Sequence, residues 1–284
     1  MGYLLFLQNL RESAPTFVNE GILFFSEFMG GTGALAVMAL VYWCISKRAG
    51  SFMLLNFSSA YMANQTLKNI FCVRRPFIRD SRLHPYASAT GYSFPSGHTM
   101  LGTAVYSSAA IWQKGRKWFV ALCALFIALT AFGRNWIGVH TPQDVIVGIL
   151  VSLVVVFGQY RMLLWLEKRP EKKILVLLLA ILWSAILLIF IPGSEKTCGI
   201  FLGVYIGWFV EEKWIHFEVQ GTLIQRILQY VLGMGFVLVV YKVLAPLVTS
   251  PFSENVQTLF INGITFFTVM ALWPALLHFV QKKK

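Results

Sequence analysis

Long apolar runs alternate with short polar or basic connections over most of this chain. Several runs approach the ~20 residues that an α-helix needs to cross the hydrocarbon core of a bilayer. Backbone groups in lipid must bond within their own segment, so we expect these runs to be helical. The pattern predicts an all-α polytopic membrane protein with about nine spans: 29–46, 51–73, 96–113, 118–136, 141–162, 173–192, 198–211, 225–247 and 256–280.

The amino-terminal region differs, because four charged residues interrupt its apolar positions. Residues 1–28 are therefore expected to form amphipathic helices in the membrane interface, with no cleaved signal peptide. No polar linker divides the chain into soluble domains. We expect a single membrane domain over 1–284, with core helices in 29–192 and three additional transmembrane helices in 193–284.

The amino-acid composition agrees with this pattern, and the distribution of charge predicts which side of the membrane each terminus faces. Hydrophobic residues make up 57% of the chain, above the ~45–50% apolar usage of soluble domains. The net charge of +12 would suit a nucleic-acid partner, but the basic residues fall in short loops between helices. The positive-inside rule explains them better. We therefore expect no nucleic-acid partner, an outer amino terminus and an inner carboxyl terminus.

The spacing of the cysteines and glycines predicts structural features and no catalytic site. The four cysteines have no metal-ligand spacing, so buried free thiols are expected and no metal site is predicted. Gly199, Gly203 and Gly207 recur every four residues, which places them on one helix face where another helix can approach closely.

Two polar segments lie at the mouths of predicted spans on the face opposite the basic loops. Lys68 and Arg75 end one span. Each taken alone is explained by a side chain that reaches the headgroup region. Ser96, Gly97 and His98 open the next span, where free helix amides favour an anion and glycine lets an oxyanion approach the backbone. A plain serine cap beside an incidental histidine is the alternative.

A third segment combines Arg134, His140 and Asp144. Thr141 and Pro142 mark a helix start, so His140 stands at its mouth and Asp144 lies one turn away. Asp144 would orient one imidazole nitrogen and leave the other free to attack. It would also suit a capping box with Thr141, and both roles are compatible.

Together the segments resemble the motifs of the type 2 phosphatidic-acid phosphatase superfamily, over residues 68–144. The superfamily includes lipid phosphate and polyprenyl-diphosphate phosphatases. Its nine-span members, glucose-6-phosphatase and the sphingosine-phosphate phosphatases, are similar in topology. One departure is Gly133, where the motif usually has serine. The matching strings are Lys68-x6-Arg75-Pro76, Pro95-Ser96-Gly97-His98 and Arg134-x5-His140-x3-Asp144.

The resemblance implies a metal-independent phosphatase without a cofactor. It implies that His140 is the nucleophile that forms a phosphohistidine, that Asp144 orients it, and that His98 protonates the leaving oxygen. The phosphoryl oxygens would be bound by Lys68, Arg75, Ser96, Gly97 and Arg134.

A lipid phosphate or diphosphate of the polyprenyl, phosphatidate or sphingoid type is the expected substrate, because an apolar chain suits a site at the membrane surface. We expect a bacterial inner membrane with the site facing outward; an endoplasmic reticulum membrane would give the same pattern. Two alternatives stay open: a phosphotransferase that passes the phosphoryl group to another lipid or glycan, and a non-catalytic transporter that binds phospholipid headgroups.

Overall fold

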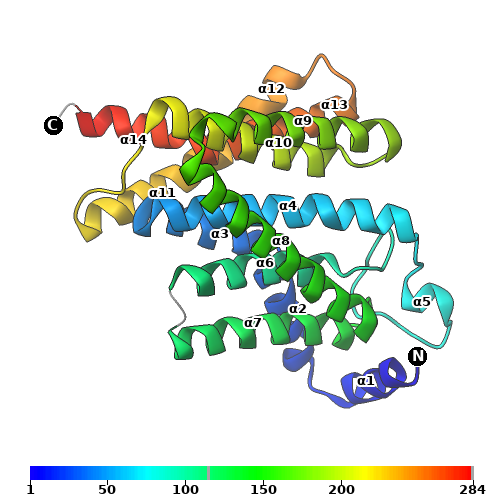
Figure 1. The fold of residues 1–284 in the computed structure, drawn as a ribbon. Coiled ribbons are helices and arrows are strands. Elements are labelled where there is room, and N and C mark those ends of the chain that lie inside the picture. The colour runs from blue at the N-terminus through cyan, green and yellow to red at the C-terminus, as the bar shows by residue number, and fades with distance from the viewer. Residues whose placement is uncertain (114–115, 283–284) are drawn as a thin grey trace. The chain divides into compact units, whose positions relative to one another are not determined.

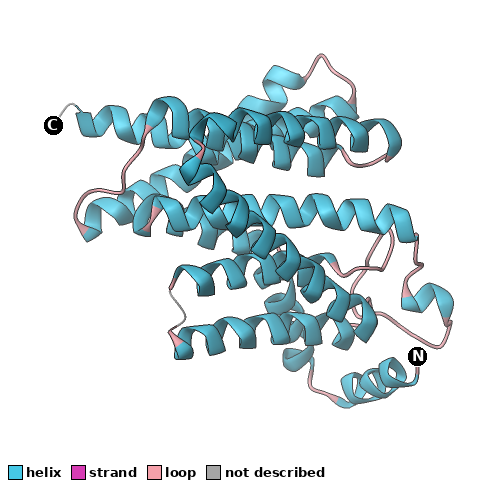
Figure 2. Cartoon of the chain, in the orientation of Figure 1, coloured by secondary structure: helices cyan, strands magenta, loops and turns pink. Residues whose placement is uncertain are grey.

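The computed structural model describes residues 1–113 and 116–282, and every regular element in them is a helix (Figures 1 and 2). The predicted all-α class is confirmed. Contacts within the chain divide it into two compact units. Unit 1 is Met1–Leu35 with Ala63–Phe157, and unit 2 is Ala36–Met62 with Gly158–Lys284. The single membrane domain and its subdivision stay a prediction.

Unit 1 is built around α2, α6 and α7, which pack against one another (Figure 1). Helix α8 begins at Pro142, whose fixed φ suits a first helical position. Helix α6 begins after Ser96, whose backbone is extended. Its helices are α1 (Gly2–Ser13), α2 (Thr16–Gly30), the start of α3 (Thr32–Leu40), the end of α4 (Lys47–Phe71), α5 (Pro76–Arg79), α6 (Gly97–Trp112), α7 (Lys117–Trp136) and the first part of α8 (Pro142–Lys168).

Unit 2 contains the remaining parts of α3, α4 and α8 and the carboxyl-terminal helices. Short π-helical turns at Val41–Ile45, Glu211–Ile215, Val240–Leu244 and Thr268–Leu272 interrupt or end its helices, and a 3₁₀ turn covers Pro170–Lys172. The other helices are α9 (Lys173–Phe190), α10 (Glu195–Val210), α11 (Leu223–Val239), α12 (Ala245–Thr249), α13 (Glu254–Phe267) and α14 (Trp273–Lys282).

The glycine face predicted at residues 199–207 lies on α10 and faces α13. A side chain at Gly199 or Gly203 would collide with backbone carbonyls of α13. At Gly207 an added Cβ would lie 2.6 Å from the Cβ of Met270. The predicted close approach is confirmed, because only glycine leaves enough room for the two backbones.

The predicted count of nine spans is not confirmed. Within residues 1–113 and 116–282, five helices are long and apolar enough to cross a membrane, or six if the bent pair Thr16–Gly30 and Gly33–Ile45 forms one span. Two of the predicted spans, α6 and α10, are helices of only 16 residues. The five helices are Lys117–Trp136, Pro142–Lys168, Pro170–Phe190, Leu223–Thr249 and Glu254–Lys282.

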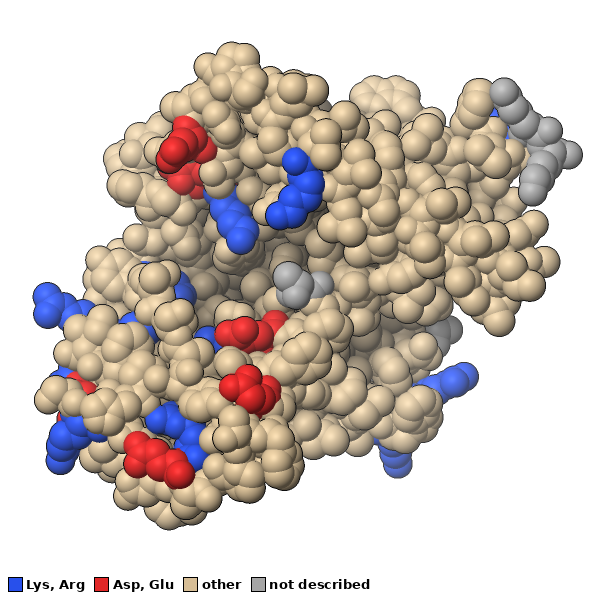
Figure 3. All heavy atoms as spheres, turned by 180° about the vertical axis from the view of Figure 1, so that it is seen from behind, with Lys and Arg blue, Asp and Glu red and all other residues tan. Residues whose placement is uncertain are grey.

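The helix surfaces support a location in the bilayer. Large apolar side chains are exposed along these helices, among them Val154, Ile189 and Leu223, each more than 70% exposed. Figure 3 shows wide areas of the surface without Lys, Arg, Asp or Glu. Exposed apolar area on this scale is typical of a membrane-facing surface, and the protein is an integral membrane protein.

Replacing Gly203 by alanine is expected to destabilise unit 2, since the new methyl group would meet the carbonyl oxygen of Gly263. Overpacking of this kind costs about 1–3 kcal/mol. The melting temperature of the detergent-solubilised protein would report the loss. Gly158→Ala is the matched control, because a Cβ there meets nothing within 4 Å. Equal melting temperatures for the two variants would contradict the close packing of α10 on α13.

Candidate active site

The first motif lies where α4 ends. Lys68 is in the last turn of α4, and Arg75 occupies the position before α5, whose first residue is Pro76. Proline's fixed φ suits a first helical position, so a new helix begins after a short extended segment. The Lys68 ammonium donates to the carbonyl oxygen of Tyr92 at 2.8 Å. The motif is therefore tied to the loop that precedes α6.

Arg75 connects this loop to the third motif. Its side chain is buried, and the guanidinium donates to the carbonyl oxygens of Thr90 (2.6 Å), Gly91 (3.1 Å) and Val139 (3.2 Å). Its Nη1 also lies 3.2 Å from Nε2 of His140. One buried cation thus holds two loops together and points at the imidazole.

The second motif begins α6, as predicted. Ser96 stands before the first helical residue and is fully buried, and its amide donates to the carbonyl oxygen of Asp144 at 3.0 Å. Its hydroxyl pairs with the hydroxyl of Thr99 at 3.0 Å rather than capping a backbone amide. A Cβ on Gly97 would lie 3.2 Å from Oδ1 of Asn64, so the missing side chain leaves room beside α4.

His98 lies in the first turn of α6. The charges of Lys68, Arg75 and Arg134 and the ring of His140 all act on its imidazole. Two histidines and three cations from the separate motifs therefore share one electrostatic environment, as a phosphate site requires.

The third motif joins α7 to α8. His140 Nδ1 lies 3.5 Å from Oδ2 of Asp144. The same carboxylate oxygen accepts the Thr141 amide at 2.8 Å, and the Asp144 amide donates to the Thr141 hydroxyl at 3.3 Å. The orienting and the capping geometry are therefore both present. Arg134, in the last turn of α7, is buried, and its Nε and Nη1 have no hydrogen-bond partner among the described residues.

Ser93 completes the surroundings of His140, and no sequence motif predicted it. Its fully buried hydroxyl donates to Oδ2 of Asp144 at 2.6 Å and lies 3.4 Å from Nδ1 of His140. Its amide donates to the carbonyl oxygen of Val73 at 2.8 Å, which fixes it in place. Ser93 lies in an irregular loop, where no regular residue spacing predicts a functional position. Its place three residues before Ser96 is the sequence feature that puts it near the second motif.

The amino-terminal helix α1 braces the same loops. Arg11 is buried and donates to the carbonyl oxygens of Trp136 (2.8 Å) and His84. Leu7 packs in an apolar cluster with Trp136 and Val139. The residues immediately before His140 are therefore held by α1, a contact that the sequence pattern did not predict. The interfacial location of residues 1–28 stays a prediction.

Burial controls the protonation of His140, which lies between the candidate spans. Loss of water around the ring lowers its pKa from 6.5 to about 3, and the positive charges of Arg75 and Arg134 act in the same direction. The hydrogen bond to Asp144 raises the pKa but does not outweigh these effects. The ring is neutral at physiological pH, which leaves a lone pair for nucleophilic attack.

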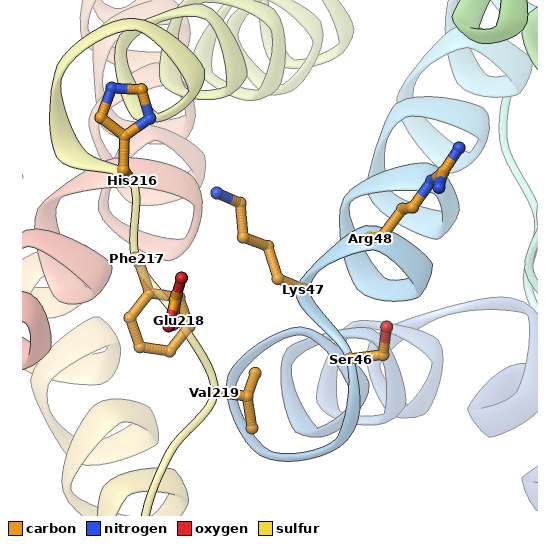
Figure 4. Close-up of a pocket in the computed structure, with 7 residues that line it drawn as sticks. All are labelled: Ser46, Lys47, Arg48, His216, Phe217, Glu218 and Val219. Atoms are coloured by element: carbon orange, nitrogen blue, oxygen red, sulfur yellow. The ribbon is translucent and has the colours of Figure 1, made fainter. Parts of the chain in front are cut away.

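Unit 2 has a separate polar hollow of about 450 Å³, shown in Figure 4. Lys47, Arg48, His216 and Glu218 are among its lining residues. Lys47 forms an ion pair with Glu211 at 2.8 Å, so its charge is already balanced. His216 was predicted to have no catalytic role, and nothing in this hollow matches the chemistry of the motif cluster.

Comparison with known proteins places these motifs in a family. The sequence model of the PAP2 superfamily matches residues 48–168, and a second model, for the transmembrane extension of PAP2 superfamily phosphatases, matches residues 196–283. The second match lies within the segment 193–284, predicted to add three helices.

Several bacterial proteins are similar in sequence. An Escherichia coli protein that bears the provisional name undecaprenyl-diphosphatase is 24% identical over 150 residues, which are 50% of this chain and 72% of that protein. Phosphatidylglycerophosphatase B of Bacillus subtilis is 30% identical over 117 residues, 38% of this chain and 55% of its own length. The crystal structure of a PAP2-type phosphatidylglycerolphosphate phosphatase from Bacillus subtilis has 21% identity and a TM-score of 0.46, covering 57% of this chain and 84% of that one.

Acidification is expected to destabilise the protein through His140. Below pH 6.5 the unfolded chain protonates this imidazole, whereas the folded protein keeps it neutral down to about pH 3. Stability contributed by the neutral ring is therefore fully present above pH 6.5 and is lost as the pH falls toward 3. Relative to His140→Gln, the unfolding free energy of the wild type should fall more steeply, by up to about 1.4 kcal/mol per pH unit. Denaturant unfolding in detergent between pH 7.5 and 5 measures both slopes, and parallel curves would contradict this.

Proposed function

The chain belongs to the PAP2 superfamily, and from that premise we propose that it hydrolyses a lipid phosphate or diphosphate through a phosphohistidine formed on His140. The observation that carries the proposal is the meeting of a neutral, oriented imidazole with three cations in one site. Transfer of a phosphoryl group depends mainly on positioning and on fixed positive charge, and this cluster supplies both.

The three cations are proposed to bind the phosphoryl oxygens. Arg134 is buried with two guanidinium nitrogens unpartnered among the described residues, so an incoming anion would satisfy donors that are otherwise costly to bury. Arg75 Nη1 faces Nε2 of His140 and would move to a phosphoryl oxygen when substrate enters. Lys68 and the backbone amide of Gly97 complete the set.

The first step forms a bond between Nε2 of His140 and phosphorus while the bond from phosphorus to the leaving oxygen breaks. Asp144 and Ser93 face Nδ1, so the proton of the ring is held on that side and Nε2 keeps its lone pair. Burial and the charges of Arg134, Lys68 and Arg75 lower the pKa of His98, so we infer that it becomes protonated only when the anionic substrate offsets those charges. It then gives its proton to the leaving oxygen, which departs as the lipid alcohol or lipid monophosphate.

The second step uses water. His98, now neutral, takes a proton from a water molecule whose oxygen attacks phosphorus, and the bond to His140 Nε2 breaks. Inorganic phosphate leaves, and both histidines return to their starting states. No step requires an oxidant, a reductant or a nucleotide.

A lipid substrate is favoured over a sugar phosphate by the membrane location. The relatives named above suggest undecaprenyl diphosphate and phosphatidylglycerophosphate as the first substrates to test. We propose that the site faces outward, because α7, one of the five candidate spans, has Arg116 and Lys117 at its start and Arg134 of the third motif in its last turn. Positive charge marks the inner end.

Replacing His140 by glutamine is expected to abolish turnover. Purified wild type should release inorganic phosphate from one or both lipids in the presence of a chelator, and His140→Gln should lose at least about a thousandfold in kcat, because the nucleophile is gone. His84→Gln, at an exposed loop histidine, is the matched control. Full activity in His140→Gln would reject the mechanism, and labelled phosphate recovered in another lipid would identify a transferase instead.

Ser93 is expected to position His140 and Asp144 rather than to touch the phosphate. Ser93→Ala removes the 2.6 Å hydrogen bond to Asp144, so kcat should fall by roughly ten- to a hundredfold while KM changes little. Ser93→Thr keeps the hydroxyl and should recover part of the rate. A changed KM with an unchanged kcat would instead assign Ser93 to substrate binding.

A further inference from the structure

Helix α2 forms one wall of the phosphate site. Its last residue, Gly30, packs so closely on α6 that an added Cβ would lie 2.6 Å from the carbonyl oxygen of His98. The next residue, Gly31, would place a Cβ 3.9 Å from Nε2 of the same histidine. The Tyr106 hydroxyl of α6 donates to the carbonyl oxygen of Met29 at 3.3 Å. The end of α2 is therefore held directly against α6, at His98 in the first turn and at Tyr106 further along the helix.

The same helix explains Gly133, the one departure from the motif pattern. A Cβ at Gly133 would lie only 2.6 Å from the Cβ of Ser26 on α2. Serine at position 133 would therefore collide with α2, and its absence lets α2 approach α7 beside Arg134. Because α2 precedes the residues matched by the PAP2 model, 48–168, this wall is an addition to the matched core.

Glu27 is the acidic side chain of α2 that faces Arg134. Its Oε1 lies 3.8 Å from Nη1 of Arg134, whose side chain is 5% exposed, whereas that of Glu27 is 51% exposed. That distance is too long for a hydrogen bond, which agrees with the unpartnered Nη1 of Arg134. The carboxylate thus balances part of the charge of Arg134 without occupying its donors.

We propose that Glu27 is a counter-ion of Arg134 whose negative charge repels phosphate and so weakens the binding of free inorganic phosphate. This rests on the proposed function of the same site. A phosphate held only by the cations feels the full repulsion of Glu27. A lipid phosphate offsets it through contacts of its apolar chain. Glu27 therefore weakens the binding of both, and the free product, which lacks apolar contacts, is released more readily.

Inorganic phosphate is the probe that tests this role. Its dissociation constant is measured from the shift in melting temperature of the detergent-solubilised protein, and its inhibition constant from turnover of the lipid substrate. Glu27→Gln should bind phosphate roughly two- to fivefold more tightly, the range expected for a half-exposed ion pair. High salt should shrink that difference, because screening weakens the repulsion. Glu27→Asp keeps the charge and should stay close to the wild type.

Glu12→Gln is the matched control, since it removes one carboxylate from the exposed face of α1 and should leave phosphate binding unchanged. Unchanged or weaker phosphate binding in a folded Glu27→Gln protein overturns the proposal, weaker binding showing that Glu27 supports Arg134 instead. The dissociation constant of phosphate is measured from the melting temperature, without turnover. It therefore tests the role of Glu27 separately from the proposed phosphatase activity. A wild type that never releases phosphate from a lipid would reject the proposed function, whereas an active enzyme with no effect of Glu27→Gln would reject only this inference.

Discussion

The guanidinium of Arg75 bonds to carbonyl groups in two loops and approaches the ring of His140, so a single buried cation sets the distance between the loop before α6 and this imidazole. A lysine could not replace it, because one ammonium lacks the planar fork that reaches three acceptors in different directions. The positions of Ser93 and His140 follow from this connection. The geometry of the proposed active site therefore depends on backbone carbonyls as much as on the motif side chains.

The site also carries more positive than negative charge. Arg75, Arg134 and Asp144 are buried, and Lys68 lies within the same field. Concentrating like charges away from water is costly, and an anion in the site would relieve that cost. In the absence of phosphate, Glu27 offsets part of it from the exposed side. For the proposed function, a site of this charge would bind anions strongly, and release of the product would matter as much as capture of the substrate.

The amino-terminal helices have a larger part in the site than their composition indicates. Their amphipathic pattern suits a membrane interface, yet Arg11 and Leu7 brace the loop before His140, and α2 packs on both α6 and α7. A helix that binds protein on one side and faces lipid on the other has the same pattern as one lying in the interface. Periodicity alone does not distinguish the two.

By itself, the sequence determined the helical class and the residues of the three motifs, because apolar run length and motif spacing are local properties of the chain. Ser93, Arg11 and Glu27 came only from the tertiary structure. Their partners, Asp144, Trp136 and Arg134, are separated from them by 51 to 125 residues, and no local pattern records such a contact. The predicted count of nine spans is not confirmed, because apolarity alone also marks helices such as α6, which turn most of their residues toward protein. Burial against protein and burial in lipid favour the same residues, and only the packed structure separates them.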